Sequence, residues 1–389
     1  MAMLTLALTA CNSTPVASEK KADTPAPPPV VLAGGQPVFT VQRPKNTDTM
    51  KPRFLNAQVL PGRGMTTYQI KAYLPGKGEI NVLESPDISE APKIMDGGPE
   101  DVMGNKSFTV GGAILLPFAN RIRGKVSADG KTIETSIDGK PMTLVANWSG
   151  KKPGAEKNAI HGLMLDSRMD KVLTDNKDDY SSVTGTLHAG DFQGHWPGKT
   201  DVETKITLKD DSFLMTVTAK NVGDVPVPIG IGWHPYFALP SGDRAQARLH
   251  VPAKKLAQVN NYDDVFPTGK VVPVAGTPYD FTAPGGTALG KQFLDDSFVD
   301  VQKTPEGKTV VEITDPAAKY GLRITSASKE VSAIQVYSPL DKKFIAVEPQ
   351  FNWVDPYGKV WAGKKTGMVE LKPGESVTYS VELTLFVRN

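Results

Sequence analysis

The sequence predicts an all-β protein, a large antiparallel β-sandwich built from many strands. Glycine and proline are frequent, with 36 and 32 residues among 389, which favours many turns over long helices. Apolar and polar residues alternate with a period of two in several stretches. No segment with the 3.6-residue period of a helix extends beyond about two turns. Runs of strands without long helices bury their apolar faces by packing sheet on sheet.

The clearest strands lie in the middle of the chain. Val, Thr, Ile or Leu recurs at every second position of residues 202–208, with charged or hydroxyl residues between. A polar turn at 209–212 follows, and the alternation resumes over residues 213–219. Because this is the pattern of two half-buried strands joined by a short turn, we expect a β-hairpin. The alternating stretch 377–385 follows Pro373-Gly374 and predicts a further strand near the C-terminus.

The charge of the chain is nearly balanced. Its 44 basic and 42 acidic residues are interspersed, and no basic block suited to a nucleic-acid backbone is present. We therefore expect no nucleic-acid partner. The single cysteine, Cys11, excludes an internal disulfide and a thiolate metal site in the folded part.

The N-terminal segment 1–11 indicates export and lipid attachment. Its apolar run is too short to span a bilayer, and it ends in Leu8-Thr9-Ala10-Cys11, which resembles a bacterial lipobox. The basic start usual in a signal is missing, since residues 1–10 contain no Lys or Arg. Lipids on Cys11 would hold the protein at a membrane, because each buried methylene adds about 0.8 kcal/mol. We expect a location in the bacterial cell envelope, lipid-anchored or periplasmic.

The composition divides the chain into three parts. After the signal and lipobox segment 1–11, residues 12–36 are rich in Ser, Thr, Lys, Ala and Pro and predict a flexible tether. Residues 37–389 show strand and turn patterns throughout and predict one β-sandwich domain. No internal repeat of fixed length is present.

Four short segments concentrate polar residues that are unusual in such a chain. They are residues 117–121, 158–162, 232–237 and 347–350. Two of the five histidines, His161 and His234, lie in them. Taken singly, each segment is more often structural, because a His beside Gly is commonly a satisfied structural histidine.

Other residues of the same types carry structural interpretations. Three aromatic residues beside His234 are expected in the core or in a pocket wall: Trp233, Tyr236 and Phe237. The remaining histidines match no motif and are interpreted as surface or structural residues: His188, His195 and His250.

The order of the four segments resembles that of the aldose 1-epimerase (galactose mutarotase) family. That family carries an A-N-R-I segment, an N-x-x-H-G segment, an H-x-Y-F segment and a Glu followed closely by a Gln. Residues 119–122 resemble the first, and His161, His234 and Glu348 fall in the other three. The resemblance implies the supersandwich fold typical of galactose mutarotases.

Two further segments extend the resemblance over residues 117–350. Leu294-Asp295-Asp296-Ser297-Phe298 resembles the segment with a sugar-binding Asp, and Ile334-Gln335-Val336-Tyr337 the one with a sugar-binding Gln. Because adjacent residues of a strand point to opposite faces, the sequence leaves open whether Asp295 or Asp296 faces the sugar.

The resemblance implies an isomerase that interconverts the α and β anomers of a free hexose. Opening the ring requires a base at the C1 hydroxyl and an acid at the ring oxygen. The resemblance assigns the base to Glu348 and the acid to His234, with His161 at the ring oxygen or a neighbouring hydroxyl. The sugar-binding residues that it implies are Asn120, Arg121, Asp295 and Gln335. It implies no metal and no organic cofactor.

Two departures from the family pattern leave the sugar preference open, and the oligomeric state is open as well. Leu-Pro-Phe precedes Ala119 where the common family form has Gly-Arg. The spacing from Gln335 to Glu348 is shorter than in the galactose enzymes.

Three alternative functions compete with this interpretation. A hexose-6-phosphate 1-epimerase needs extra Lys or Arg for the phosphate, and an export signal argues against it. A non-catalytic carbohydrate-binding protein on the same fold would lack the base or the acid, whereas both are present here. A glycoside hydrolase needs two carboxylates that flank the scissile bond, and only one lies in the four segments.

Overall fold

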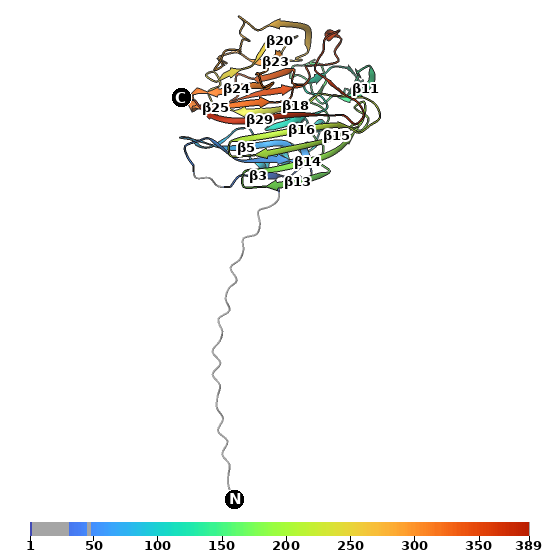
Figure 1. Cartoon of the computed structure of the whole chain (residues 1–389). Coiled ribbons are helices and arrows are strands. Elements are labelled where there is room, and N and C mark those ends of the chain that lie inside the picture. The colour runs from blue at the N-terminus through green and yellow to red at the C-terminus, as the bar shows by residue number, and fades with distance from the viewer. Residues whose placement is uncertain (2–30, 45–47, 389) are drawn as a thin grey trace. The chain divides into compact units, whose positions relative to one another are not determined.

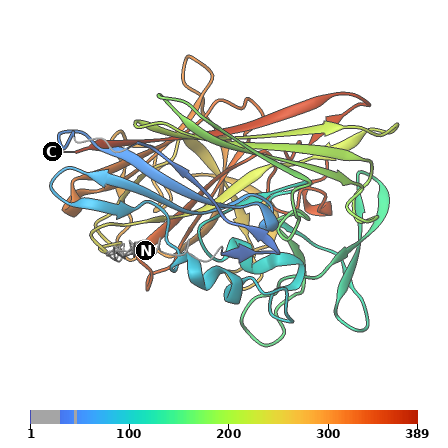
Figure 2. The same cartoon turned by 90° about the horizontal axis from the view of Figure 1, so that it is seen from below.

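Two large β-sheets pack face to face in the computed structural model, which describes residues 1, 31–44 and 48–388. Figure 1 shows the strands of the domain, and Figure 2 shows the same domain turned by 90°. In that second view the green strands and the red β29 lie above the blue strands β3 to β5. Residues from Val31 onward form one compact unit.

The first sheet contains nine strands within the described residues, and every neighbouring pair is antiparallel. Its order is β13 (Lys171–Asn176), β14 (Ser181–Gly190), β15 (Thr200–Leu208), β16 (Ser212–Asn221), β29 (Ser376–Val387), β25 (Tyr320–Ser326), β24 (Thr309–Asp315), β19 (Arg248–His250) and β22 (Thr287–Ala288). The pairing of β15 with β16 confirms the predicted hairpin, and β29 confirms the predicted C-terminal strand.

The second sheet contains eleven strands in the described part of the chain, again all antiparallel. Its order is β21 (Pro267–Pro273), β20 (Ala253–Val259), β23 (Leu294–Val301), β26 (Ala333–Ser338), β27 (Phe344–Gln350), β18 (Gly232–Ala238), β7 (Gly112–Leu115), β5 (Thr66–Leu74), β4 (Arg53–Leu60) and β3 (Phe39–Gln42), with β6 (Gly78–Asn81) beside β5.

Short strands and helices lie outside the two large sheets. The short strands are β1 (Leu32–Ala33) with β2 (Gln36–Pro37), β8 (Arg121–Ile122) with β12 (Ala159–Ile160), β9 (Lys125–Val126) with β10 (Thr132–Ile137) and β11 (Lys140–Val145), and β17 (Val227–Ile229) with β28 (Val369–Leu371). The helices are α1 (Ala91–Ile94) and the 3₁₀ turns η1 (Pro61–Arg63), η2 (Ile88–Glu90), η3 (Val102–Phe108), η4 (Pro316–Ala318) and η5 (Lys359–Trp361). Across the described residues, none of these helices has the length and apolar character needed to cross a membrane.

The core lies between the two large sheets because alternate side chains of their strands point inward. Phe213 of β16 stacks on Trp233 of β18, with ring centroids 5.9 Å apart. Phe237 of β18 is fully buried in the same cluster, so Trp233 and Phe237 are core residues, as expected. Burying one such side chain contributes about 1.5–3 kcal/mol to the free energy of folding. This contribution keeps the face of β18 that carries Trp233 and Phe237 against the core. The other face is left for polar residues.

The ordered strands begin before the predicted domain boundary at residue 37. β1 and β2 form a hairpin that turns at Gly34 and Gly35, both with positive φ, a conformation that glycine adopts without steric cost. Residues 32–36 are therefore a hairpin and not part of a tether, because Ala33 is buried by tertiary packing that composition does not reveal. Residues 2–30, with Cys11, the lipobox and most of the predicted tether 12–36, lie outside the described residues.

Candidate active site

Four neighbouring strands of the eleven-stranded sheet, β23, β26, β27 and β18, present polar side chains on one face. Gln335 of β26 pairs directly with Glu348 of β27, so their side chains share that face. Gly232 of β18 pairs with Gln350 of β27, and Tyr236 pairs with Ala346, so His234 between them lies opposite Glu348. Asp295 of β23 is two residues from Ser297, which pairs with Gln335, and it therefore points the same way.

A loop and a short strand pair complete the face with Asn120, Arg121 and His161. Arg121 in β8 pairs with Ile160 in β12, which brings the two segments together. Asn120 and His161 both have a positive φ, 61° and 62°, which is uncommon for residues other than glycine. The His161 N–H donates to the Asn120 carbonyl at 2.9 Å, so tertiary contacts hold this strained backbone.

The side chain of Asn352 fixes the loop that carries Asn120. Its amide Nδ2 donates to the Ala119 carbonyl at 2.9 Å, and its Oδ1 accepts the Ala119 N–H at 3.0 Å. A buried residue outside the four polar segments thus positions the backbone of the site.

Asn120 also determines the tautomer of His161. The Asn120 N–H donates to Nδ1 of His161 at 3.3 Å, so Nδ1 is an acceptor and the proton of the neutral ring lies on Nε2. Burial, helped by His234 and Arg121, holds the pKa of His161 well below its usual value. His161 is therefore neutral near pH 7 and offers a hydrogen-bond donor at Nε2.

Seven of these residues line one cavity with a volume of about 870 Å³. The seven residues to which the sequence analysis assigned catalytic or sugar-binding roles are part of its lining: Asn120, Arg121, His161, His234, Asp295, Gln335 and Glu348. They come from distant parts of the chain, and the fold brings them to one place. The role of each residue stays a prediction.

His234 and Glu348 form a buried pair at the base of this face. Nε2 of His234 lies 3.3 Å from Oε1 of Glu348, and Gln350 donates its amide to Oε2 at 2.8 Å. Burial raises the pKa of Glu348 well above its usual value, although Gln350 opposes this. Burial lowers the pKa of His234 to about 4. Because burial disfavours charge on both groups, it favours the neutral carboxylic acid beside the neutral imidazole, a form in which the pair holds one proton.

The polar residues across the cavity hold one another in a network. Gln335 accepts from Nδ2 of Asn120 at 3.1 Å and donates to Oδ1 of Asp295 at 2.7 Å. Arg121 Nη2 lies 3.5 Å from Oδ2 of Asp295. Burial raises the pKa of Asp295, whereas Arg121 and Gln335 lower it. Nε of Arg121 has no hydrogen-bond partner within the described residues.

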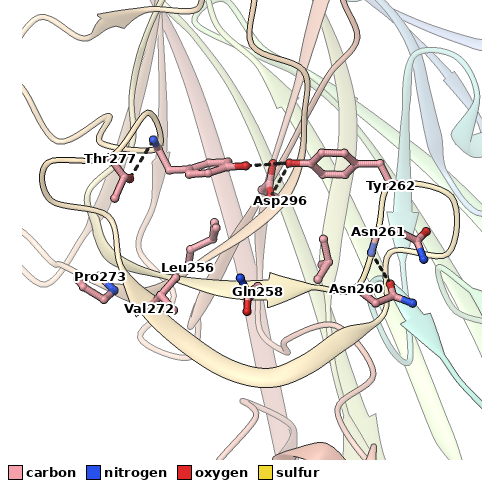
Figure 3. A pocket seen from close by; sticks show the side chains of 11 residues that line it. Leu256, Gln258, Asn260, Asn261, Tyr262, Val272, Pro273, Thr277 and Asp296 are labelled. Carbon is pink, nitrogen blue, oxygen red and sulfur yellow. Dashed lines mark hydrogen bonds between the residues drawn. The ribbon is translucent and has the colours of Figure 1, made fainter.

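The structure decides between the two adjacent aspartates. Asp295 lines the cavity with Glu348, whereas Asp296 points to the other side of β23. Figure 3 shows Asp296 beside Tyr262, whose hydroxyl donates to Oδ2 of Asp296 at 3.0 Å. Burial raises the pKa of Asp296 to about 7. Asp296 therefore belongs to a different cavity.

Three residues that contact the acid–base pair had no functional role predicted from the sequence. Phe108 of η3 packs against the rings of His161 and His234, with centroids 4.7 Å and 5.9 Å away, and nothing in its local sequence indicates this. Tyr236, which the sequence places in the core or in a pocket wall, lies in the wall of the cavity. Its ring centroid is 4.8 Å from that of His234. Gln350 could have been found, because it stands two residues after Glu348 in a strand and so shares its face.

The other histidines lie outside this cavity. His188 is exposed and pairs with Asp201 at 3.1 Å. Nδ1 of His195 lies 2.7 Å from the Thr143 carbonyl, and Nδ1 of His250 lies 3.2 Å from that of Ala283. In the part of the chain that the structure describes, no group of three or more His, Cys, Asp or Glu residues is placed to hold a metal ion.

Comparisons with known sequences point to one family. A family model described as aldose 1-epimerase matches residues 78–384. Galactose mutarotase of Homo sapiens is 26% identical over 188 residues, which are 47% of this chain and 48% of that protein. The uncharacterized protein YphB of Escherichia coli K12 is 25% identical over 190 residues, which are 45% of this chain and 57% of that protein. The chain thus spans about half the length of the curated relatives that it matches.

Solved structures share the fold. A galactose mutarotase-like protein from Clostridium acetobutylicum superposes with a TM-score of 0.65 at 20% identity, covering 86% of this chain and 94% of that chain. The fold class predicted from the sequence, a large antiparallel β-sandwich of the galactose mutarotase type, is confirmed.

Proposed function

The chain belongs to the aldose 1-epimerase family, and from this premise we propose that it interconverts the α and β anomers of a free aldose by opening and reclosing the sugar ring. The observation that carries the proposal is the buried pair of His234 and Glu348, 3.3 Å apart, in a cavity lined by a polar network. A base and an acid in one cavity are what ring opening requires.

The proposed reaction moves protons between this pair and the sugar. The single proton of the pair first moves from Glu348 to His234, whose atoms lie 3.3 Å apart. Glu348, now the carboxylate, takes the proton of the C1 hydroxyl, and the C1–O electrons form the aldehyde carbonyl. The bond from C1 to the ring oxygen breaks, and His234, as the imidazolium, gives its proton to that oxygen. Rotation about C1–C2 and the reverse proton transfers close the ring on the other face. The pair holds one proton before and after, so no further reactant is needed.

The polar network supports the proposal by fixing the sugar before reaction. Arg121, Asn120 and Gln335 offer donors, and Asp295 offers an acceptor, at positions already set by their mutual hydrogen bonds. Because these contacts orient the side chains, a bound sugar meets oriented groups and little reorganisation is required.

The charges of the cavity favour a neutral sugar over a sugar phosphate. Among the described residues, the further charged residues of the lining are Lys151, Lys342, Lys343, Glu84, Asp263 and Asp341. Lys342 lies 3.6 Å from Asp341, and the carboxylates offset the lysines in number. A phosphate site would instead present an excess of Lys or Arg donors.

Polarimetry of freshly dissolved α-D-glucose, α-D-galactose and α-D-glucose 6-phosphate tests the proposal. We expect the purified protein to speed the approach of the two free hexoses to their equilibrium rotation. Acceleration of the phosphate alone would instead support the hexose-6-phosphate alternative. Sugar binding without acceleration would support the non-catalytic carbohydrate-binding alternative.

Gln350→Met is expected to shift the pH dependence of the reaction upward. The substitution keeps the side-chain volume and removes the amide that lowers the pKa of Glu348. The pKa therefore rises, which disfavours transfer of the proton of the pair from Glu348 to His234. Between the two pKa values of the pair, kcat falls about tenfold for each unit by which the pKa of Glu348 rises, and the falling limb of kcat against pH moves upward. Gln69→Met, at another buried Gln, is the control, and an unmoved profile for Gln350→Met would contradict the role of Gln350.

We propose in addition that Cys11 carries a lipid anchor. This proposal rests on the segment Leu8-Thr9-Ala10-Cys11 alone. Cys11→Ser is expected to release the protein from membranes without changing its rate on soluble sugar, because Glu348 and His234 lie in the sandwich. Membrane fractionation and polarimetry measure the two effects. Wild-type protein in the soluble cytoplasmic fraction would contradict the proposal.

A further inference from the structure

The cavity around Glu348 is larger than a single hexose requires. Its volume of about 870 Å³ lies near the upper end of the range of about 300–1,000 Å³ that encloses drug-sized ligands. A hexose is considerably smaller than such a ligand. Space is therefore left beyond the sugar ring that contacts His234 and Glu348.

Aromatic side chains line that additional space in an unbroken series, here called the aromatic strip. Its members are Tyr236, Phe344, Tyr337, Phe293 and Tyr262, all in the lining of the cavity. The centroid distances are 4.8 Å from His234 to Tyr236, 4.7 Å from Tyr236 to Phe344, 6.3 Å from Phe344 to Tyr337, 6.2 Å from Tyr337 to Phe293 and 4.9 Å from Phe293 to Tyr262. The strip thus begins beside the acid–base pair and leads away from it to the exposed Tyr262.

A second cavity, with a volume of about 360 Å³, adjoins the far end of the strip. Tyr262 lines both cavities. Figure 3 shows its ring directed at Asp296, and its hydroxyl lies 3.0 Å from Asp296 Oδ2 and 3.0 Å from the hydroxyl of Tyr279. Asp296 is buried, so this contact anchors an otherwise exposed ring.

The lining of the second cavity suits a sugar ring. Its polar residues include Gln258, Asn260, Asn261 and Thr277, and its apolar residues include Leu256 and Val272. A pyranose has apolar C–H faces that pack on aromatic or aliphatic side chains, and hydroxyls at its edge that bond to amides and hydroxyls. Both features recur along the strip and in the second cavity.

We propose that the protein binds an oligosaccharide whose reducing end lies at His234 and Glu348 and whose further rings pack along the aromatic strip toward Tyr262 and the second cavity. This inference rests on the proposed function, because it takes the acid–base pair as the position of the anomeric carbon. It names the substrate class as a neutral oligosaccharide with a free reducing end.

Exchange NMR at anomeric equilibrium tests the inference, since it reports interconversion for sugars of any length. The probes are glucose, maltose and maltotriose, with cellobiose and cellotriose for the other linkage. For wild-type protein we expect kcat/KM for one of the two trisaccharides, maltotriose or cellotriose, to exceed kcat/KM for glucose at least about tenfold. This ratio corresponds to about 1.4 kcal/mol.

Phe293→Ala interrupts the strip away from the acid–base pair. We expect it to remove most of the trisaccharide advantage and to leave kcat/KM for glucose within about twofold of wild type, because glucose occupies only the His234 end. Phe293→Leu, which keeps an apolar side chain and removes the ring, serves as a second variant with less effect on folding. Phe386→Ala, at a half-buried Phe of the other sheet, is the matched control and should keep the advantage.

The possible results are distinct. Equal kcat/KM for glucose and for every oligosaccharide with wild-type protein would overturn the inference and leave the proposed function intact. A trisaccharide advantage that persists in both Phe293 variants would overturn the strip as the binding surface. No acceleration of any sugar, glucose included, would overturn the proposed function and the inference together.

Discussion

Glu348→Gln is expected to lower the mutarotation rate by at least about a hundredfold while sugar binding persists. The substitution keeps the shape of the side chain and its ability to hydrogen-bond, but it removes the basicity. Glu348 is buried, lies 3.3 Å from His234 and has a raised pKa, which suits a base that acts near neutral pH. Asp295, the other carboxylate of the polar network, bonds to Gln335 and is paired with Arg121.

Polarimetry and calorimetry separate the two effects of this substitution. The rate should fall in polarimetry, whereas the affinity measured by calorimetry should change little, because the polar network is untouched. Glu312→Gln, at a carboxylate that pairs with Arg323 on the other sheet, is the control and should keep the full rate. A wild-type rate for Glu348→Gln would assign the base to another group, with Asp295 the first to examine.

His234→Asn is expected to lower kcat by about 10²–10⁴, the usual contribution of one positioned proton donor. Asparagine can still hydrogen-bond to the sugar or to Glu348, but it cannot carry a proton to the ring oxygen. The substitution also removes the ring that packs against Phe108, His161 and Tyr236, so thermal unfolding must be measured beside kcat.

The size of the effect distinguishes the two histidines of the site. The ring of His161 lies 4.9 Å from that of His234, close enough to be the alternative acid. A fall in kcat of less than about threefold for His234→Asn would assign the acid to His161. His250→Asn, outside the cavity, is the control and should leave kcat unchanged.

Local patterns predicted the long strands well and the short ones poorly. The alternation over residues 202–208 and 213–219 is a property of adjacent residues, so it could be recognised without knowledge of the fold. β1 and β2 fall in a stretch whose Ala and Pro content is typical of a tether, and only the burial of Ala33 against the domain makes them strands. A two-residue strand such as β8 carries no periodic signal, and its pairing with β12 comes from tertiary contacts.

The sequence by itself determined the chemistry available to this protein. The residues His161, His234 and Glu348, in polar segments within an all-β pattern, supply two imidazoles and a carboxylate, and side-chain identity needs no coordinates to be known. The tertiary structure decided which of these groups meet and how they are tuned. Whether Asp295 or Asp296 faces Glu348 depends on the strands beside β23, because alternation along one strand defines two faces without saying which is covered. The raised pKa of Glu348 and the lowered pKa of His234 arise from burial by residues distant in the chain, and desolvation depends on those neighbours and not on the local sequence.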